Sequence, residues 1–140
     1  MYLLISAFFL PFFVLILIWK TNKAFLWNSV KKYSFNVQEP YKTFLINGEK
    51  IIEWRLNKWK FKEAKIWDIF YLDDENIEFE VWTKREYPTF EKMLEEEWLK
   101  NVLPDKDDIK KWIEEVYYKF YTKNDEEKYG VVAIEFKKLS

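Results

Sequence analysis

Three charged side chains that lie within six positions of one another, Lys50, Glu53 and Arg55, are the strongest candidates for chemistry. If residues 53 and 55 lie on one strand, their side chains face the same side of it. A lysine in a partly desolvated cleft has a lowered pKa and can act as a base or activate a nucleophile. The lysine and arginine can instead bind a phosphate or a base edge, with Glu53 accepting from an amino group. A third interpretation is an ion pair that only fixes the local chain.

Composition excludes several other chemistries. The 140 residues include no cysteine and no histidine, which excludes thiolate nucleophiles, disulfides, zinc-thiolate sites, imidazole ligands and histidine-dependent triads. The serines lie in no G-x-S-x-G context, and the glycine-rich phosphate-binding motifs are missing. We interpret the acidic runs at 73–75, 95–97 and 125–127 as solvated turns and helix ends rather than metal ligands. We therefore expect no metal and no cofactor.

Charge is unevenly divided along the chain. Residues 20–68 carry eleven Lys/Arg against five Asp/Glu, a net of +6, whereas residues 69–140 carry twelve against nineteen, a net of −7. Within the basic half, a predicted loop over 57–62 interleaves lysines with aromatic residues: Lys58, Trp59, Lys60, Phe61 and Lys62. This mixture suits a phosphate backbone and unstacked bases. The alternative is a set of solvated lysines without a ligand.

The N-terminal segment is strongly apolar. Residues 1–19 carry no charge and are long enough to cross a bilayer, which predicts a transmembrane helix over 1–20 followed by a linker over 21–30. Lysines follow this stretch and none precedes it, so the positive-inside rule places the N-terminus outside and the remainder in the cytoplasm. The same composition is expected if AT-rich DNA upstream of a gene is translated from a start assigned too early, with Val30 as the true start.

The pattern from residue 31 onward predicts a single α+β domain. Tyr33, Phe35 and Val37 alternate as on a strand, and Gly48 is placed to end a short helix. We predict strands over 32–37, 51–56, 66–72, 77–84 and 129–136, and helices over 40–47, 89–98 and 107–121. In the last helix, helical spacing predicts one buried stripe made of Ile109, Trp112, Ile113, Val116, Tyr117 and Phe120.

The octapeptide at 48–55, GEKIIEWR, matches G-x-K-x-x-E followed closely by Arg, the signature of the ASCH domain. Further segments resemble prokaryotic ASCH proteins in the same order, among them VQEPY at 37–41, REYP at 85–88, NVLP at 101–104 and YGVVAI at 129–134. The resemblance covers about residues 31–138. It implies a PUA-like β-barrel with flanking helices and a cleft lined by the motif that faces RNA, here preceded by the hydrophobic helix.

One subgroup of the family resembles amidohydrolases that remove the acetyl group from acetylated cytidine with a Lys, a Thr and a Glu. Lys50 stands at the Lys position, and Glu97, with Glu96 as second choice, stands at the Glu position. Glu53 occupies the Thr position, a departure that removes a hydroxyl and adds a charge. The resemblance thus gives Lys50, Glu53 and Glu97 as catalytic candidates. The binding candidates are Lys50, Glu53, Arg55, Lys58, Lys60 and Lys62.

These observations predict a protein that binds RNA or a modified nucleoside in a cleft lined by the motif. One alternative is an amidohydrolase that deacetylates nucleosides of the acetylated cytidine type. Another is a structural or interaction domain tethered to the membrane through residues 1–19.

The chain contains two glycines and eight tryptophans. In the ASCH family the position of Trp54 is usually glycine, and similar glycines are expected near Trp59, Trp67 and Trp98. Trp98 stands where a helix should end in a left-handed residue, and Trp67 stands where a tight turn should lie; an indole adopts positive φ only at a cost. We hypothesise that the gene reads UGA as glycine and was translated with UGA as tryptophan. The competing interpretation is that Trp54 and Trp59 stack on bases.

Overall fold

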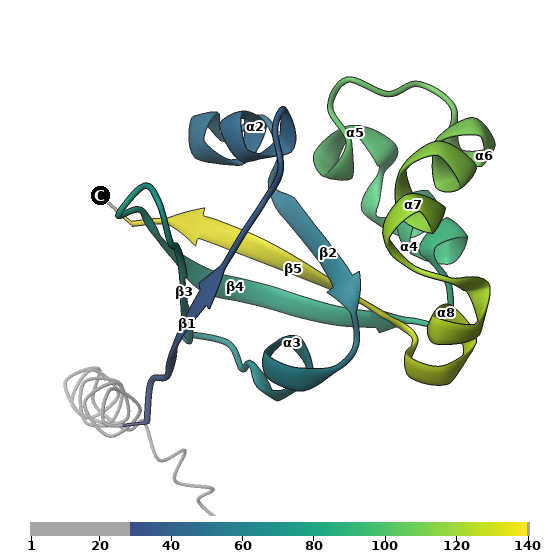
Figure 1. The fold of residues 1–140 in the computed structure, drawn as a ribbon. Coiled ribbons are helices and arrows are strands. Elements are labelled where there is room, and N and C mark those ends of the chain that lie inside the picture. The colour runs from purple at the N-terminus through teal and green to yellow at the C-terminus, as the bar shows by residue number, and fades with distance from the viewer. Residues whose placement is uncertain (1–28, 140) are drawn as a thin grey trace, which may run out of the picture. The chain divides into compact units, whose positions relative to one another are not determined.

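The computed structural model describes residues 29–139 (Figure 1). The chain divides into two units, one ending at Val30 and the other beginning at Lys31. The predicted transmembrane helix and most of the linker fall in residues 1–28, outside the described residues. Within residues 29–139, no helix is long and apolar enough to cross a bilayer.

The domain is built on a mixed five-stranded sheet with the strand order β1-β3-β4-β5-β2. The strands are β1 (Lys32–Phe35), β2 (Ile52–Leu56), β3 (Ile69–Leu72), β4 (Glu78–Tyr87) and β5 (Val131–Lys138). Strands β1 and β3 pair in parallel, and the other neighbouring strands are antiparallel. The α+β class is confirmed, but the predicted barrel closure is not, because β1 and β2 are the two edges of the sheet and do not pair.

The largest differences from the predicted strand bounds lie at the start of β3 and at the end of β4. Strand β3 begins at Ile69 rather than at residue 66, because Trp67 has a φ of 80° and lies in a turn that precedes the strand. Strand β4 continues to Tyr87 because its second half pairs with the first half of β5 as far as Val131. A register shift between Val81 and Thr83 accompanies this long pairing.

Two helices, one before β2 and one after β4, follow local capping rules. Helix α2 (Tyr41–Asn47) ends at Gly48, whose left-handed φ of 80° was predicted from its position. Helix α4 (Phe90–Glu97) begins after Thr89, whose hydroxyl accepts from the N–H of Lys92 at 3.1 Å. The predicted loop at 57–62 is wrong in part, because residues 59–63 form a short helix, α3 (Trp59–Glu63).

A π-helical turn interrupts the helix predicted over 107–121. The segment consists of α6 (Ile109–Trp112), the π turn η1 (Ile113–Tyr117) and α7 (Tyr118–Phe120). A π turn inserts one extra residue, so residues beyond it rotate away from the expected face. Phe120 is therefore 52% exposed, contrary to the prediction, and Tyr121 stacks on Phe90 in its place.

Two further helices were not predicted, α5 (Leu99–Val102) and α8 (Lys123–Tyr129). The strand expected from residue 129 consequently begins at Val131. The acidic run within α8 is not wholly solvated, because Glu126 is buried, accepting from the N–H of Phe90 at 2.9 Å and from the hydroxyl of Tyr118 at 3.3 Å. This carboxylate satisfies an N–H in the first turn of α4.

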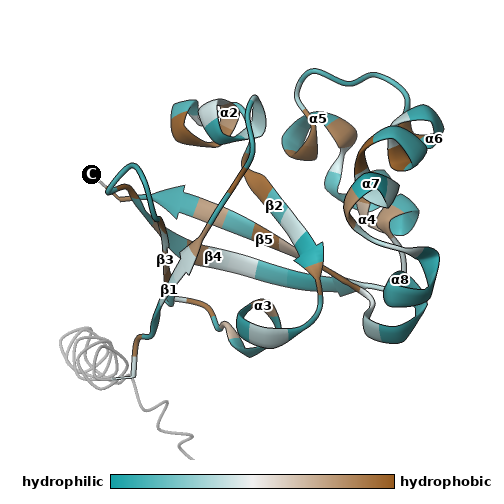
Figure 2. Cartoon of the chain, viewed as in Figure 1, coloured by the Kyte–Doolittle hydropathy of each residue, from teal (hydrophilic) through white to brown (hydrophobic). Residues whose placement is uncertain are grey.

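Two hydrophobic clusters cover the two faces of the sheet. Helices α4 to α8 gather where β4 ends and β5 begins (Figure 1), and their buried side chains pack on Ile52, Trp54 and Ala133. Phe35, Phe70 and other apolar side chains form the second cluster with Val132 and Ile134 of β5. Figure 2 shows hydrophobic residues along β2 and β5 as well as on the helices. Because both faces are covered, a functional side chain on the sheet is positioned chiefly by strands β2 and β5.

Candidate functional site

The side chain of Lys50 is buried just before β2, with 1% of its surface exposed. Its Nζ donates to the carbonyl oxygens of Ile52 and Val102, the second at 2.9 Å. The same nitrogen lies 3.4 Å from Oε2 of Glu53. An ammonium group has three N–H donors. Two of these donors bind the carbonyl oxygens and the ammonium charge lies against Glu53, so Lys50 is held in place from several sides.

Glu53, on β2, lies between the cations Lys50 and Arg55, and its side chain is also 1% exposed. Its Oε1 accepts from Nη1 of Arg55, whereas its Oε2 accepts no hydrogen bond from the described residues. Arg55 is more accessible, with 17% of its side chain exposed. We call Lys50, Glu53 and Arg55 the motif cluster. The structure brings all three together, and Glu53 Oε2 is left able to accept a further hydrogen bond.

Burial dominates the electrostatics of the motif cluster. Desolvation lowers the pKa of Lys50 to about 8; the charge of Glu53 opposes this change, and the charge of Arg55 adds to it. Because two basic groups surround one carboxylate, the motif cluster favours binding of an anionic ligand. Oε2 of Glu53, which accepts no well-formed hydrogen bond within residues 29–139, favours an N–H or O–H donor.

Basic side chains link the two unpaired edges of the sheet. Arg55 on β2 donates to the carbonyl oxygen of Asn36, just beyond β1, at 2.7 Å. Lys60 on α3 donates to the carbonyl oxygen of Ser34 in β1. Side-chain hydrogen bonds therefore satisfy carbonyl groups at an edge where a closed barrel would have backbone pairs. Arg55 and Lys60 thus have a structural role in addition to any role in binding.

The lysines at 58, 60 and 62 differ in the contacts that they make. We call Lys58, Lys60 and Lys62 the basic surface. Nζ of Lys58 lies 4.2 Å from the ring centroid of Trp59 and 5.0 Å from that of Tyr129. Lys62 is exposed. Neither Lys58 nor Lys62 forms an ion pair with another residue in the 29–139 range, so both charges are available to a ligand.

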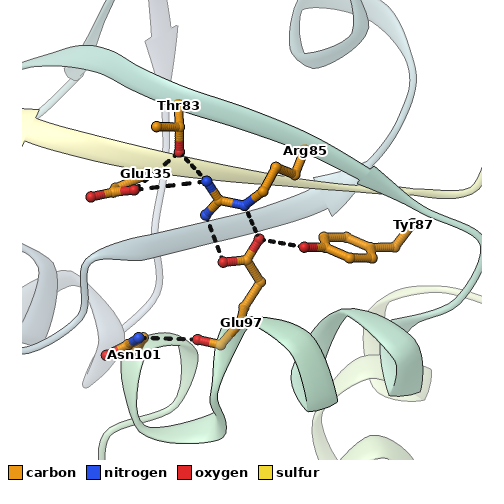
Figure 3. Close-up of polar contacts among 6 residues, drawn as sticks. All are labelled: Thr83, Arg85, Tyr87, Glu97, Asn101 and Glu135. Atoms are coloured by element: carbon orange, nitrogen blue, oxygen red, sulfur yellow. Dashed lines mark hydrogen bonds and ion pairs between the residues drawn. The ribbon is translucent and has the colours of Figure 1, made fainter.

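Glu97 lies in a second cluster, which we call the Arg85 clamp (Figure 3). Arg85 donates to both carboxylate oxygens of Glu97, from Nη2 to Oε2 at 2.6 Å and from Nε to Oε1. The hydroxyl of Tyr87 donates to Oε1 at 2.7 Å, and Asn101 Nδ2 donates to the Glu97 carbonyl at 3.0 Å. Thr83 accepts from Arg85 and donates to Glu135 at 3.0 Å. The clamp joins α4 to β4.

Sheet register separates the two clusters. Arg85 pairs with Ala133 on β5, and Glu53 pairs with the next residue, Ile134. Neighbouring residues of a strand point to opposite faces of the sheet. Glu97, which is bound to Arg85, is not joined to the motif cluster by a hydrogen bond or ion pair in the described part of the chain. The three catalytic candidates are thus divided between two places.

The environment of Glu97 favours its ionised form. Burial alone would raise its pKa, but the hydrogen bonds from Arg85 and Tyr87 outweigh that effect and hold the pKa below its ordinary value. Burial and the carboxylate raise the pKa of Tyr87 to about 12. Glu96, the second choice for the same role, is exposed and pairs with Lys92 at 3.1 Å. An ionised carboxylate with partners on both oxygens is suited to holding α4 rather than to transferring protons.

Sequence reasoning placed Tyr117 only in the core, but the structure relates it to the motif cluster. Its side chain is fully buried in the π turn, and its hydroxyl has no hydrogen-bond partner among the described residues. Burial, followed by the charges of Glu53 and Tyr41, raises its pKa well above the ordinary value. A π turn in the predicted helix is the signal that points to such a residue, and it is not visible in the hydrophobic spacing.

Within residues 29–139, no group of three or more His, Cys, Asp or Glu side chains is arranged to hold a metal ion. The polar residues of the motif cluster are two cations and one carboxylate, a donor set that suits an anionic organic ligand better than a cation.

The family model for the ASCH domain matches residues 35–140. The chain belongs to the ASCH family. Among solved structures, a crystal structure of the hypothetical protein PH0355 from Pyrococcus is 37% identical, with a TM-score of 0.73 over 77% of this chain and 99% of that one. The solution structure of protein PF0455 from Pyrococcus furiosus is 36% identical, with a TM-score of 0.67 over 78% of this chain and 98% of that one.

None of the curated proteins compared with this chain matches it significantly. The ASCH match and the two solved structures confirm the resemblance stated from the motif. The RNA-facing cleft that the ASCH resemblance implies stays a prediction.

Proposed function

We propose that this ASCH domain binds RNA through the basic surface and Arg55. The observation that carries the proposal is the contact between Arg55 of the motif cluster and helix α3, beside the basic surface. Arg55, the accessible member of the motif cluster, adjoins α3; Lys62 in this helix and Lys58 just before it form no ion pair within residues 29–139. Arg55 also lies over the ring of Phe61 in α3, with 5.3 Å from its Cζ to the ring centroid. Phosphate groups are the ligands that such unpaired cations favour.

The buried part of the motif cluster adds a second kind of recognition. Oε2 of Glu53 is buried and lies 3.4 Å from Nζ of Lys50, but it accepts no well-formed hydrogen bond from the described residues. An unmade hydrogen bond on a buried acceptor is costly, and a ligand that supplies a donor recovers that cost. Exocyclic amino groups of cytosine or adenine and the ribose 2′-hydroxyl are donors of this kind. The two features together support a ligand with both a phosphate and such a donor, which describes RNA.

The test is binding of a short fluorescein-labelled single-stranded RNA, followed by fluorescence anisotropy at several salt concentrations. The wild-type domain should bind with an affinity that falls as salt rises. Lys58→Ala and Lys62→Ala should each weaken binding and reduce the slope of log K against log salt by about 0.7. Lys110→Ala, which removes an exposed charge on α6, is the matched control and should leave affinity and slope unchanged. Equal losses in all three variants, or no binding at low salt, would refute the proposal.

A second candidate function is deacetylation of an acetylated cytidine, and one observation favours it: the pKa of Lys50 is lowered to about 8. A lysine with such a pKa is a plausible base near neutral pH. Against it stand the burial of Nζ and the separate location of Glu97 in the Arg85 clamp. Turnover of acetylated cytidine that Lys50→Ala abolishes, with RNA binding retained, would favour the enzyme over the binding module.

A further inference from the structure

Four residues other than glycine have positive φ in the described part of the chain, and three of them are tryptophans. Asn76 has a φ of 51°, and asparagine is one of the few side chains that tolerate this region. The others are Trp59 at 51°, Trp67 at 80° and Trp98 at 67°. A bulky side chain at such an angle is a steric outlier. One chance outlier is unremarkable, but three of one residue type require a common cause.

The two glycines of the chain show what these angles are normally used for. Gly48 has a φ of 80°, the value found at Trp67, and Gly130 has a φ of 67°, the value found at Trp98. Trp98 separates α4 from α5 with a ψ of 115°, which places it outside the right-handed, extended and left-handed regions that L-residues occupy. The backbone at this position therefore has a conformation that glycine alone adopts without strain.

The indoles recover little of the strain by packing, although the ring of Trp67 meets that of Trp82 edge to face and Lys58 lies over the ring of Trp59. Trp59 is 73% exposed, Trp67 is 41% exposed and Trp98 is 76% exposed. Burial of apolar surface is the main benefit that an aromatic side chain brings to a fold. Side chains that are so open to solvent have forgone much of that benefit. The usual compensation for a strained residue, a functional contact, is also missing from the described contacts of Trp98.

The other described tryptophans behave differently. Trp112 has a φ of −84°, and Trp54 is 7% exposed and packs against Phe90 and Tyr117. Trp82 lies on β4 and is not at positive φ. The chain thus contains ordinary tryptophans as well as tryptophans at glycine backbone positions. Trp54 belongs by its structure with the first kind, so the hypothesis that it replaces a glycine stays a prediction.

We infer that residues 59, 67 and 98 are glycines in the protein that the source cell makes. Each is encoded by UGA, a codon that the cell reads as glycine and that this sequence renders as tryptophan. Part of the deficit of glycine and of the surplus of tryptophan in the composition has the same origin. The inference goes beyond the proposed function, because it concerns what stands next to Lys58 and Glu97. Without the indole at 59, the basic surface binds RNA by charge, with no stacking partner at that position.

Three measurements test the inference. The codons at 59, 67 and 98 should be UGA, and mass spectrometry of the peptides from the native protein should find glycine at each position. UGG codons at these positions would overturn the inference, as would tryptophan in the native peptides.

The third measurement uses the chain that carries tryptophan at all three positions. Trp59→Gly, Trp67→Gly and Trp98→Gly should each raise the melting temperature, by about 4 °C, because each relieves a strained φ. Trp82→Gly is the matched control for Trp59 and Trp98, which it does not contact in the described residues: Trp82 is 45% exposed but lies on a strand, where its ring meets that of Trp67. That variant should lower the melting temperature, because glycine weakens a strand. A decrease at 59, 67 and 98 similar to that at 82 would contradict the inference, because it would show that the indoles belong there.

Discussion

The motif cluster and the Arg85 clamp contain the same kinds of groups but differ in how completely those groups are partnered. In the clamp, Glu97 accepts hydrogen bonds on both carboxylate oxygens, and its arginine is 38% exposed. In the motif cluster, Lys50 and Glu53 are each 1% exposed, and one oxygen of Glu53 lacks a hydrogen bond. A fully partnered carboxylate fixes a helix, whereas a buried and incompletely partnered one retains capacity to bind.

The two clusters also differ in burial, and burial decides how much the loss of one charged partner costs. Desolvation makes isolated charges in the motif cluster expensive, so removing one partner leaves the others without compensation. In the clamp, water can reach Arg85 and partly replace a lost partner. The two clusters should therefore respond very differently to equivalent substitutions.

The largest effect is expected for Glu53→Gln. This variant keeps the shape of the side chain but leaves Lys50 and Arg55 without their anion, and we expect a loss of about 3 kcal/mol in the free energy of unfolding at pH 7. Urea unfolding measures the loss. Glu49→Gln is the matched control, since Glu49 is exposed in the same motif, and it should change stability by less than about 0.5 kcal/mol.

Adding Lys50→Met to Glu53→Gln sharpens the comparison. Removal of the buried cation as well as the anion should recover part of the stability, because the unpaired charge is the source of the cost. If the double variant is as unstable as the sum of both single variants, packing rather than charge explains the loss.

A smaller effect is expected for the clamp. A double-mutant cycle with Arg85→Met and Glu97→Gln should give a coupling free energy of about 1 kcal/mol, discounted because Arg85 is 38% exposed. Urea unfolding of the wild type, both single variants and the double variant measures it. Coupling as large as that between Lys50 and Glu53 would remove the contrast between the two clusters.

Sequence alone predicted the motif cluster because its members lie within six residues and share a recognisable spacing. It predicted α2, α4 and the sheet strands from the residue pattern, and the end of α2 from Gly48. It failed where a non-local or irregular feature decides the outcome. The π turn that exposes Phe120 leaves no trace in the spacing.

The separation of Glu97 from Glu53 was also not predicted, because it depends on a non-local feature. It depends on which residues of β5 oppose β2 and β4, a register set by long-range pairing. Positive φ at Trp67 and Trp98, by contrast, was predictable because turns and helix ends are local. Local geometry is therefore accessible from this sequence, whereas contacts across the sheet are not.

The smallest effect, taken per pH unit, is a dependence of stability on alkaline pH to which Lys50 contributes most. Its pKa is about 8 in the folded protein against an ordinary value of 10.5, so between these values the unfolded chain holds a proton that the folded one has lost. Stability then rises with pH in this interval, by about 1 kcal/mol per pH unit at most. Urea unfolding at pH 7.5, 8.5 and 9.5, about the range of the shift, should show the rise in the wild type and its loss in Lys50→Met. Lys84→Met is the matched comparison, because burial also lowers the pKa of Lys84, which lies outside the motif cluster. If Lys84→Met removes the rise and Lys50→Met does not, then the motif cluster is not the site of the perturbed lysine, and the contrast between the two clusters rests on hydrogen bonding alone.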